Sequence, residues 1–225
     1  MKLVIRVGGS VIASPFNPEL INAYSELLLN LKQHGNQIAM VVGGGSLSRE
    51  LIGTAKAIGL DETAQDEVAI SVSRLTAQLM MLKLKGDRAC SVPVTIADAA
   101  KQAEQDGIAV MGGLKPGMTT DTVAALIAEK IHADLLIKAT DVDGVFNKDP
   151  KKHRDAKKFD RLTYAELPGI FEKKHHEAGI HQVIDPEAIK TLKKARLKTV
   201  VVNGCKPENI LLAVQGEEVG TVISS

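Results

Sequence analysis

The stretch MVVGGGSLSRE, residues 40–50, joins an apolar run to three consecutive glycines and then to an arginine. An apolar run of this kind predicts a buried β-strand, and the pattern after the glycines predicts a helix. The glycines do not complete a G-x-G-x-x-G dinucleotide fingerprint, because Ser48 stands where the third glycine would be. The P-loop string G-x-x-x-x-G-K-[ST] does not occur in the chain. Bare backbone between a strand and a helix therefore predicts an anion-binding turn that neither common motif explains.

Outward from this turn, short β-rich runs alternate with helical patterns along the chain. Strands are predicted at 2–7, 37–42, near 89–92, and at 107–111, 134–139 and 198–202, with an edge strand at 219–224. Helices are predicted at 18–34, from the triple glycine to about 58, and at 61–85, 95–105, 121–131, 163–174 and 186–195. This alternation predicts an α/β fold with a mainly parallel sheet covered on both faces. We expect one domain, 1–225, with two lobes around a cleft.

Composition argues against several classes of protein. The chain has 225 residues, of which 44% are apolar, and this is enough for one large α/β core. A formal charge of +1 and 3% aromatic residues, none of them Trp, offer neither a strong field nor a stacking platform for nucleic acid. Only Cys90 and Cys205 are present, which indicates a reducing compartment. Since no stretch resembles a signal peptide or membrane span, we expect a cytoplasmic protein without nucleic-acid or membrane partners.

Glycine-rich loops follow three of the predicted strands. They are GGS (8–10), GGG (43–45) and GG (112–113), the last of which begins a loop that runs to 119–120. Parallel strands end at one edge of a sheet, where exposed N–H groups and positive helix ends favour phosphate. A single loop of this kind is usually a tight turn. Three at one edge suit a site for several phosphate groups, as in phosphate transfer between two nucleotides.

Phosphoryl transfer needs cations to offset charge, and three basic residues lie close to these loops. Arg6 is in the first strand, Arg49 is expected in the first turn of the helix after the triple glycine, and Lys138 ends the 134–139 strand. An unpaired charge inside an apolar strand would be costly. We therefore favour a functional Arg6 over one whose head group only reaches solvent from the strand end.

Two carboxylates stand at the starts of predicted helices. Asp121 and Asp185 fit plain N-caps, which contribute about 1 kcal/mol each. The Asp-Pro pair at 185–186 fits capping very well. A catalytic site would instead use both carboxylates to orient cations or Mg²⁺. The residue pattern does not separate these interpretations.

The predicted helix 61–85 carries an apolar stripe with the spacing 4, 3, 4, 3. The stripe consists of Val68, Val72, Leu75, Leu79 and Leu82. Such a stripe must pack against something, which is either the core of the same chain or a second subunit. The length of the helix leaves both interpretations open.

Several motifs occur in a fixed order and together resemble the amino acid kinase family. They are VGGSVI (7–12), MVVGGGSLSRE (40–50), MGGLKPGMTTDTVAALIAE (111–129), IKATDVDGVFNKDP (137–150) and VIDPEAIK (183–190). They are most similar to its short archaeal-type uridylate (UMP) kinase branch, over essentially the whole chain. The resemblance implies a three-layer αβα sandwich, with an acceptor-binding lobe at about 1–132 and an ATP-binding lobe at about 133–225. It also implies a homo-hexamer that uses ATP with Mg²⁺ to convert UMP to UDP, releasing ADP, in pyrimidine nucleotide synthesis.

The resemblance and the charge pattern together assign candidate site residues. Arg6, Arg49, Asp121, Lys138 and Asp185 would carry or organise the chemistry. ATP would contact Gly9, Ser10, Gly45, Arg49, Thr140, Asp141, Phe146 and Asp149. UMP would contact Gly44, Asp66, Leu114, Lys115, Pro116, Gly117, Met118, Thr119 and Thr120, with Asp66 at the ribose and both threonines near the phosphate.

Three positions depart from the pattern that many members of this family share. Arg6 stands where many carry Lys, which keeps the charge but changes its shape and hydration. Phe146 replaces a usual Tyr, so a hydroxyl contact to the nucleotide is absent. Asp141 replaces a common Asn.

Other functions on the same fold remain open. Kinases of carbamate, acetylglutamate or isopentenyl phosphate are alternatives, although isopentenyl phosphate kinases carry a His shortly after the triple glycine, where Ser48 and Arg49 stand here. A non-catalytic nucleotide sensor or oligomeric storage protein is a third alternative. The presence of Asp121, Asp185 and the basic residues argues against it.

Two polar segments invite other interpretations. HHEAGIH (175–181) has histidines, but the spacing is not H-E-x-x-H and Gly179 interrupts a helical arrangement, so we assign no metal site. NKDPKKHRDAKK (147–158) reads as a solvated loop, with closure over the ATP triphosphate as the alternative.

Overall fold

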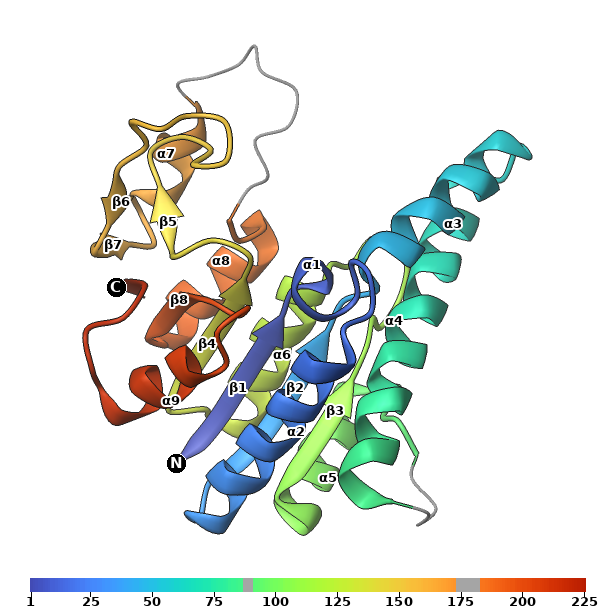
Figure 1. The fold of residues 1–225 in the computed structure, drawn as a ribbon, viewed down its shortest axis with the longest axis horizontal. Coiled ribbons are helices and arrows are strands. Elements are labelled where there is room, and N and C mark those ends of the chain that lie inside the picture. Colours follow the sequence, from blue (N-terminus) through green and yellow to red (C-terminus); the bar gives the residue numbers. More distant parts are fainter. Residues whose placement is uncertain (87–90, 173–182) are drawn as a thin grey trace.

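The computed structural model describes residues 1–86, 91–172 and 183–225, and its centre is a seven-stranded sheet (Figure 1). Five strands run parallel in the spatial order β3 (Ile108–Met111), β2 (Gln37–Val42), β1 (Lys2–Val7), β4 (Leu135–Thr140) and β8 (Thr199–Asn203). β9 (Thr221–Ser224) pairs antiparallel with β8, and β7 (Arg161–Thr163) pairs parallel with β9. The prediction of a mainly parallel sheet is confirmed.

Helices cover both faces of this sheet, which gives the expected three-layer αβα sandwich. One face is covered by α2 (Pro18–Gln33), α4 (Glu62–Lys85) and α9 (Glu208–Gln215), and the other by α5 (Ile96–Asp106), α6 (Thr120–Ile131) and α8 (Pro186–Ala195). α1 (Gly9–Ile12) and α3 (Gly45–Ala57) follow the carboxyl ends of β1 and β2. α7 (Leu167–Glu172) and the hairpin of β5 (Val145–Phe146) and β6 (Lys158–Phe159) lie together at the upper left of Figure 1.

Alternation along β1 explains how one strand serves two cores. Leu3, Ile5 and Val7 pack into the layer that holds α2, α4 and α9. Val4 points to the opposite face and packs into the layer that holds α5, α6 and α8. Successive side chains of a strand point to opposite faces, so Arg6 leaves the sheet on the same side as Val4. The strand therefore directs one charged side chain towards α6.

The predicted helix at 18–34 is confirmed as α2, and its start shows why. The side chain of Asn17 accepts hydrogen bonds from the backbone N–H groups of Glu19 and Leu20 at 2.9 and 3.1 Å. Pro18 occupies the first turn, where its missing N–H group costs nothing. Local capping chemistry thus fixes this helix start before any tertiary contact is made.

The C-terminal third differs from the predicted elements. The strand expected at the edge, 219–224, is internal, because β7 pairs with its outer side. The helix expected at 163–174 is reduced to α7 in the described residues, because 161–163 join the sheet. Sequence reasoning missed α9 and the two-residue strands β5 and β6, which are too short for periodicity to reveal. The strand expected near 89–92 is not found at 91–92, which have no regular structure, and its first two residues lie outside the described residues. The HHEAGIH segment, 175–181, also lies outside them.

The apolar stripe of α4 divides between two environments. Val72 is buried, as an ordinary core interpretation expects. Leu75, Leu79 and Leu82 are 55%, 43% and 47% exposed, so that interpretation is wrong for these three leucines. The helix instead turns Thr76, Ala77 and the two methionines Met80 and Met81 inward.

None of the helices in the described ranges combines the length and the apolar character that crossing a membrane requires.

Candidate active site

The carboxyl ends of β1, β2, β3 and β4 converge on one cavity of about 1140 Å³. Its walls include loops 8–10, 43–45 and 113–120, so the three glycine-rich loops do meet at one edge, as predicted. α4 contributes one end of the cavity, and the segment 140–152 contributes the other. The cavity therefore extends from α4 on one side of the glycine-rich loops to 140–152 on the other.

Most of the predicted site residues line this cavity. They are Arg6, Gly9, Ser10, Gly44, Gly45, Arg49, Asp66, Lys115, Gly117, Met118, Thr119, Thr120, Asp121, Lys138, Thr140, Asp141, Phe146 and Asp149. Leu114, Pro116 and Asp185 are not among the lining residues. The carbonyl of Leu114 faces α4, where it accepts a hydrogen bond from a side chain of that helix.

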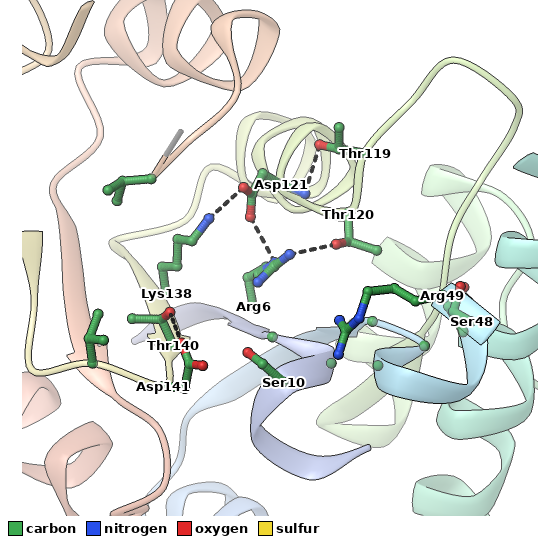
Figure 2. A pocket seen from close by; sticks show the side chains of 18 of the residues that line it. Arg6, Ser10, Ser48, Arg49, Thr119, Thr120, Asp121, Lys138, Thr140 and Asp141 are labelled. Carbon is green, nitrogen blue, oxygen red and sulfur yellow. Dashed lines mark hydrogen bonds and ion pairs between the residues drawn. The ribbon is translucent and has the colours of Figure 1, made fainter. Parts of the chain in front are cut away.

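Three charged side chains meet at the middle of the cavity (Figure 2). Arg6 and Lys138 are paired positions on β1 and β4, so their side chains leave the same face of the sheet. Both reach Asp121 at the start of α6: its Oδ1 lies 2.7 Å from Arg6 Nε, and its Oδ2 accepts a hydrogen bond of 2.5 Å from Lys138 Nζ. The Arg6 contact is an ion pair without the alignment of a hydrogen bond. We call these three residues the charged centre.

The charged centre carries one more positive than negative charge. Burial lowers the pKa of Lys138 from its ordinary 10.5 to about 8, although the carboxylate of Asp121 opposes this shift. Burial acts to raise the pKa of Asp121, but the charges of Arg6 and Lys138 outweigh it and hold that pKa below its usual range. At neutral pH two cations therefore share one carboxylate. The remaining charge favours a phosphate group in the cavity.

Hydrogen bonds at the N-terminus of α6 connect this helix to Arg6 and to the preceding loop. Arg6 Nη2 donates a hydrogen bond of 2.9 Å to Thr120 Oγ1. Thr119 Oγ1 caps the helix by accepting from the backbone N–H groups of Asp121 and Thr122, at 3.2 Å each. Capping thus fixes the helix start, and with it the orientation of the Asp121 carboxylate.

Asp185 lies behind this helix start. Its Oδ1 caps α8 by accepting from the N–H groups of Glu187 and Ala188 at 3.0 Å each. The same carboxylate accepts hydrogen bonds from Thr119 Oγ1 at 2.6 Å and from Thr122 Oγ1 at 2.8 Å. The predicted cap is confirmed, and the same side chain joins α8 to α6. Its role in organising the site stays a prediction.

Arg49 is an exposed cation on the other side of the glycine loops. It is the fifth residue of α3, so it lies in the second turn and not in the first turn as predicted. Its Nη2 donates to Ser14 Oγ at 3.2 Å. Figure 2 shows its guanidinium group above the loop that carries Ser10.

The glycines allow backbone to pack on backbone. A Cβ atom on Gly9 would lie 2.2 Å from the nitrogen of Gly45, and Gly45 itself has a φ of +65°. A Cβ atom on Gly112 would lie 2.5 Å from the backbone nitrogen of Arg74. These glycines are required by loop packing, which the sequence interpretation did not anticipate. No side chain caps the start of α3, so the backbone N–H groups of its first turn are the donors available to bind an anion there.

One end of the cavity is shaped by α4 and the loop that follows β3. Asp66 Oδ2 accepts a hydrogen bond of 2.7 Å from the backbone N–H of Gly117. Ala69, Ile70 and Met118 add apolar surface beside it. A carboxylate beside an apolar wall suits the hydroxyl groups and ring of a nucleoside. The ribose contact of Asp66 stays a prediction.

Sequence reasoning missed two residues of α4 that hold the loop after β3, of which Ser73 lines the cavity. Ser73 Oγ accepts a hydrogen bond of 2.7 Å from the N–H of Gly113, and the guanidinium group of Arg74 donates to the carbonyls of Gly113 and Leu114. Ser73 lies seven residues after Asp66, which places both on one face of a helix. That spacing was the signal available in the sequence.

The other end of the cavity is polar and basic. Asp141 is ion-paired with Lys151, and Asp149 Oδ1 accepts a hydrogen bond of 2.9 Å from the N–H of that lysine. Burial acts to raise the pKa of Asp141, but the hydrogen bond and charge of Lys151 hold it below its ordinary value. Lys148 and Lys152 also line the cavity. The first part of the basic segment 147–158 therefore faces the site instead of only facing solvent.

The donor set fits a metal ion that arrives with a ligand better than a resident one. Within the ranges that the structure describes, no group of three or more His, Cys, Asp or Glu side chains could hold a metal. Asp121 and Asp141 line the cavity, and both are already ion-paired. Mg²⁺ is commonly held by one or two carboxylates together with substrate phosphates, and the cavity allows that arrangement.

A three-layer αβα sandwich with a two-cation centre between two subsites defines a phosphate-transferring α/β protein. Residues 1–203 match the amino acid kinase family, and the chain belongs to that family. The predicted family and fold are thereby confirmed.

Two archaeal relatives match the chain from end to end. The uridylate kinase of Archaeoglobus fulgidus is 42% identical, with 100% of each chain covered, and its crystal structure superposes with a TM-score of 0.88. The uridylate kinase of Methanobrevibacter smithii is 39% identical over 226 residues, again with 100% of each covered. The UMP kinase of Bacillus anthracis has a TM-score of 0.81 at 22% identity, covering 99% of this chain and 95% of its own, and so supports the fold alone.

Proposed function

We propose that this protein is a uridylate kinase, which transfers the γ-phosphate of ATP to UMP and releases UDP and ADP. The full-length similarity to archaeal uridylate kinases supports the activity. The observation that carries the chemistry is the charged centre, in which Arg6 and Lys138 share the single carboxylate of Asp121. Such a centre can offset the charge on a phosphoryl group in transit between two nucleotides.

The two ends of the cavity take different nucleotides in this proposal. UMP lies against α4 and the loop 113–120, with Asp66 at its ribose and Thr119 and Thr120 near its phosphate. ATP lies across 140–152, with its phosphates directed to Gly9, Ser10 and the start of α3. The N-terminal part, about 1–132, thus supplies most of the acceptor site, and the remainder, about 133–225, supplies most of the ATP site within a single domain.

The chain's own residues contribute position and charge to the reaction. Arg6 is held by Asp121 and Thr120, so its guanidinium group does not have to reorganise when phosphate arrives. Lys138 adds a second fixed cation, and Arg49 supplies a third from the exposed side of the glycine loops. Asp121 acts as the orienting carboxylate and not as a base, because its pKa lies below the ordinary range. Mg²⁺ bound with ATP would supply further charge neutralisation on the phosphates.

The choice of acceptor is tested by one experiment. ADP release is measured with UMP, CMP, dTMP, carbamate, acetylglutamate and isopentenyl phosphate at equal concentrations. We expect a clear preference for UMP, and preference for any acceptor without a uridine would overturn the proposal. No ADP release with any acceptor, despite nucleotide binding, would instead favour the sensor or storage alternative.

The exposed leucines of α4 support a second part of the proposal, a cytoplasmic homo-oligomer, taken as a hexamer from the family resemblance. Leu75, Leu79 and Leu82 form an apolar strip on one side of the helix. Burying such a strip stabilises by about 25 cal/mol per Å² before association costs are subtracted.

Light scattering of Leu75→Glu beside the wild type tests this assembly. We expect a smaller particle for the variant, since a charge would enter the contact, with its helical content retained because the side chain is exposed. Lys83→Glu, on the same helix, is the control. A monomeric wild type at micromolar concentration would rule out the oligomer.

A further inference from the structure

The guanidinium group of Arg74 donates hydrogen bonds to the backbone of the loop that follows β3. Its Nε donates to the carbonyl of Gly113 at 3.1 Å, and its Nη2 donates to the carbonyl of Leu114 at 2.8 Å. The loop also packs directly on the helix at this point, since a Cβ atom on Gly112 would lie 2.5 Å from the Arg74 nitrogen. The first residues of the loop are therefore fixed to α4 by contact and by hydrogen bonds.

The geometry needs the planar fork of an arginine. Two adjacent carbonyls are bonded by different nitrogens of one guanidinium group, an arrangement that the single ammonium of a lysine reproduces only in part. The residue is partly buried, which strengthens a charge-assisted hydrogen bond relative to one in water.

The loop has a second attachment to the same helix. After the residues held by Arg74, Lys115 and Gly117 line the cavity, and the Gly117 N–H then donates to Asp66 Oδ2 at 2.7 Å. The stretch 113–117 is thus attached at both ends to α4, at positions two turns apart. Ser73 Oγ also accepts a hydrogen bond of 2.7 Å from the N–H of Gly113, so Ser73 and Arg74 together hold the beginning of the loop, and Arg74 is the one that holds its carbonyls.

We propose that Arg74 is a positioning residue, which holds the loop 113–117 in its binding conformation and so sets the affinity for the phosphate acceptor. This inference rests on the proposed function for the identity of the acceptor as UMP. When only a fraction of the molecules has the competent conformation, the apparent affinity falls by that fraction. Loss of Arg74 therefore weakens acceptor binding, while the ATP end of the cavity, formed by 140–152, keeps its shape.

Steady-state kinetics with each substrate varied separately tests the inference. The variants are Arg74→Met, which keeps bulk without donors, and Arg74→Lys, with Lys83→Met as an exposed control on the same helix. For Arg74→Met we expect KM for UMP to rise about tenfold, as when the competent loop falls to about a tenth of the population. KM for ATP should stay within about twofold of the wild-type value, which in binding free energy is less than half of a tenfold change. Arg74→Lys should recover part of the loss.

Hydrogen–deuterium exchange of the peptide covering 112–119, in the protein without ligands, gives a readout that does not depend on activity. Faster exchange in Arg74→Met than in the wild type and in Lys83→Met supports the inference. Wild-type exchange together with a wild-type KM for UMP overturns it, as does an equal rise in both KM values. If the wild type does not phosphorylate UMP, the proposed function fails and exchange alone decides the role of Arg74. If Arg74→Met does not fold, Arg74→Gln takes its place in both measurements.

Discussion

The charged centre and the acceptor loop 113–117 line one cavity but are held in place by different means. Arg6 and Lys138 come from neighbouring buried strands in fixed register, and Asp121 comes from a capped helix start. The acceptor loop has no regular structure and is held by hydrogen bonds between its backbone and side chains of α4. A fixed set of charges suits the transfer step, whereas a loop attached at its ends suits recognition. Damage to the first should change turnover, and damage to the second should change affinity.

Asp121→Asn should break the charged centre and give the largest effect. We expect kcat to fall by about 10²–10³, the usual cost of losing one preorganised charge stabiliser. Removing one partner of a buried ion pair typically destabilises by about 3–5 kcal/mol. The loss should lie at the lower end, because Lys138 can release its proton. Turnover and the free energy of unfolding in denaturant are measured together.

The matched control is Asp106→Asn, whose carboxylate pairs with Lys85 at the surface. An exposed pair contributes at most about 1 kcal/mol, so neither quantity should change much there. Wild-type turnover in Asp121→Asn would show that the carboxylate only caps and packs.

Arg49→Ala should separate catalysis from stability more cleanly. The side chain is exposed and its hydrogen bond to Ser14 is 3.2 Å long, so the free energy of unfolding should change by less than about 0.5 kcal/mol. Turnover should fall by about 10², because a phosphate-stabilising cation is lost. Lys56→Ala, also exposed on α3, is the control for the helix. Equal turnover in the two variants would contradict a phosphate role for Arg49.

The pH dependence should show the cation of Lys138 directly. Its pKa of about 8 predicts that kcat/KM declines above pH 8, as the ammonium group loses its proton and the charged centre loses its excess charge. The contribution of Lys138 to the free energy of unfolding should instead increase over the same pH range. The unfolded chain, where this lysine titrates near 10.5, binds more protons than the folded one between pH 8 and 10.5, so this group makes unfolding less favourable as pH rises.

Lys138→Arg sharpens this test, since arginine keeps its charge throughout the range. The decline of kcat/KM should disappear in that variant, whatever its absolute rate. A decline that persists unchanged would assign the titration to another group.

Gly117→Ala should give the smallest effect, confined to the acceptor loop. Gly117 has a φ of +74° with open space around its Cα, so the substitution adds backbone strain and no clash. The left-handed conformation costs a non-glycine residue about 1 kcal/mol, which corresponds to roughly a fivefold rise in KM for UMP. kcat at saturating UMP should stay close to that of the wild type.

Gly216→Ala is the matched control, because its φ of +85° and open surroundings repeat the strain at the end of α9, away from the main cavity. The two variants should lose similar stability and differ only in KM for UMP. Equal KM values would show that the conformation of Gly117 has no part in binding.

Much of the site could be predicted because its signals are local. Strand ends followed by glycines and a capping residue such as Asp185 are readable one segment at a time, and parallel strands must bring their ends together. The cap of α6 was predicted wrongly as Asp121, because Thr119 begins that helix two residues earlier. The interpretation of Arg6 as more than a solvent-reaching side chain also followed from its sequence, since the cost of an unpaired charge in an apolar strand demands a partner. The identity of that partner, Asp121, did not follow, because it lies 115 positions away in the chain.

The exposed stripe of α4 shows where periodicity stops being informative. Spacing of 4, 3, 4, 3 identified a helix and an apolar side, but the sheet packs against Thr76, Ala77 and Met80 instead. Two overlapping sets of residues could each have faced inward. The choice depended on how closely the helix approaches the sheet, which is a property of all the neighbouring layers together.

By itself, the sequence determined the α/β class and the meeting of the glycine-rich loops at one edge of a mainly parallel sheet, because short-range propensity and periodicity encode these features. Tertiary structure alone decided that two cations share Asp121, that Gly9 and Gly112 are required by backbone contacts, and that Arg74 holds the loop 113–117. The physical reason is the same in each case. Ion pairs, close backbone approaches and hydrogen bonds between distant segments depend on distances of a few ångströms, and only the packed layers set those distances.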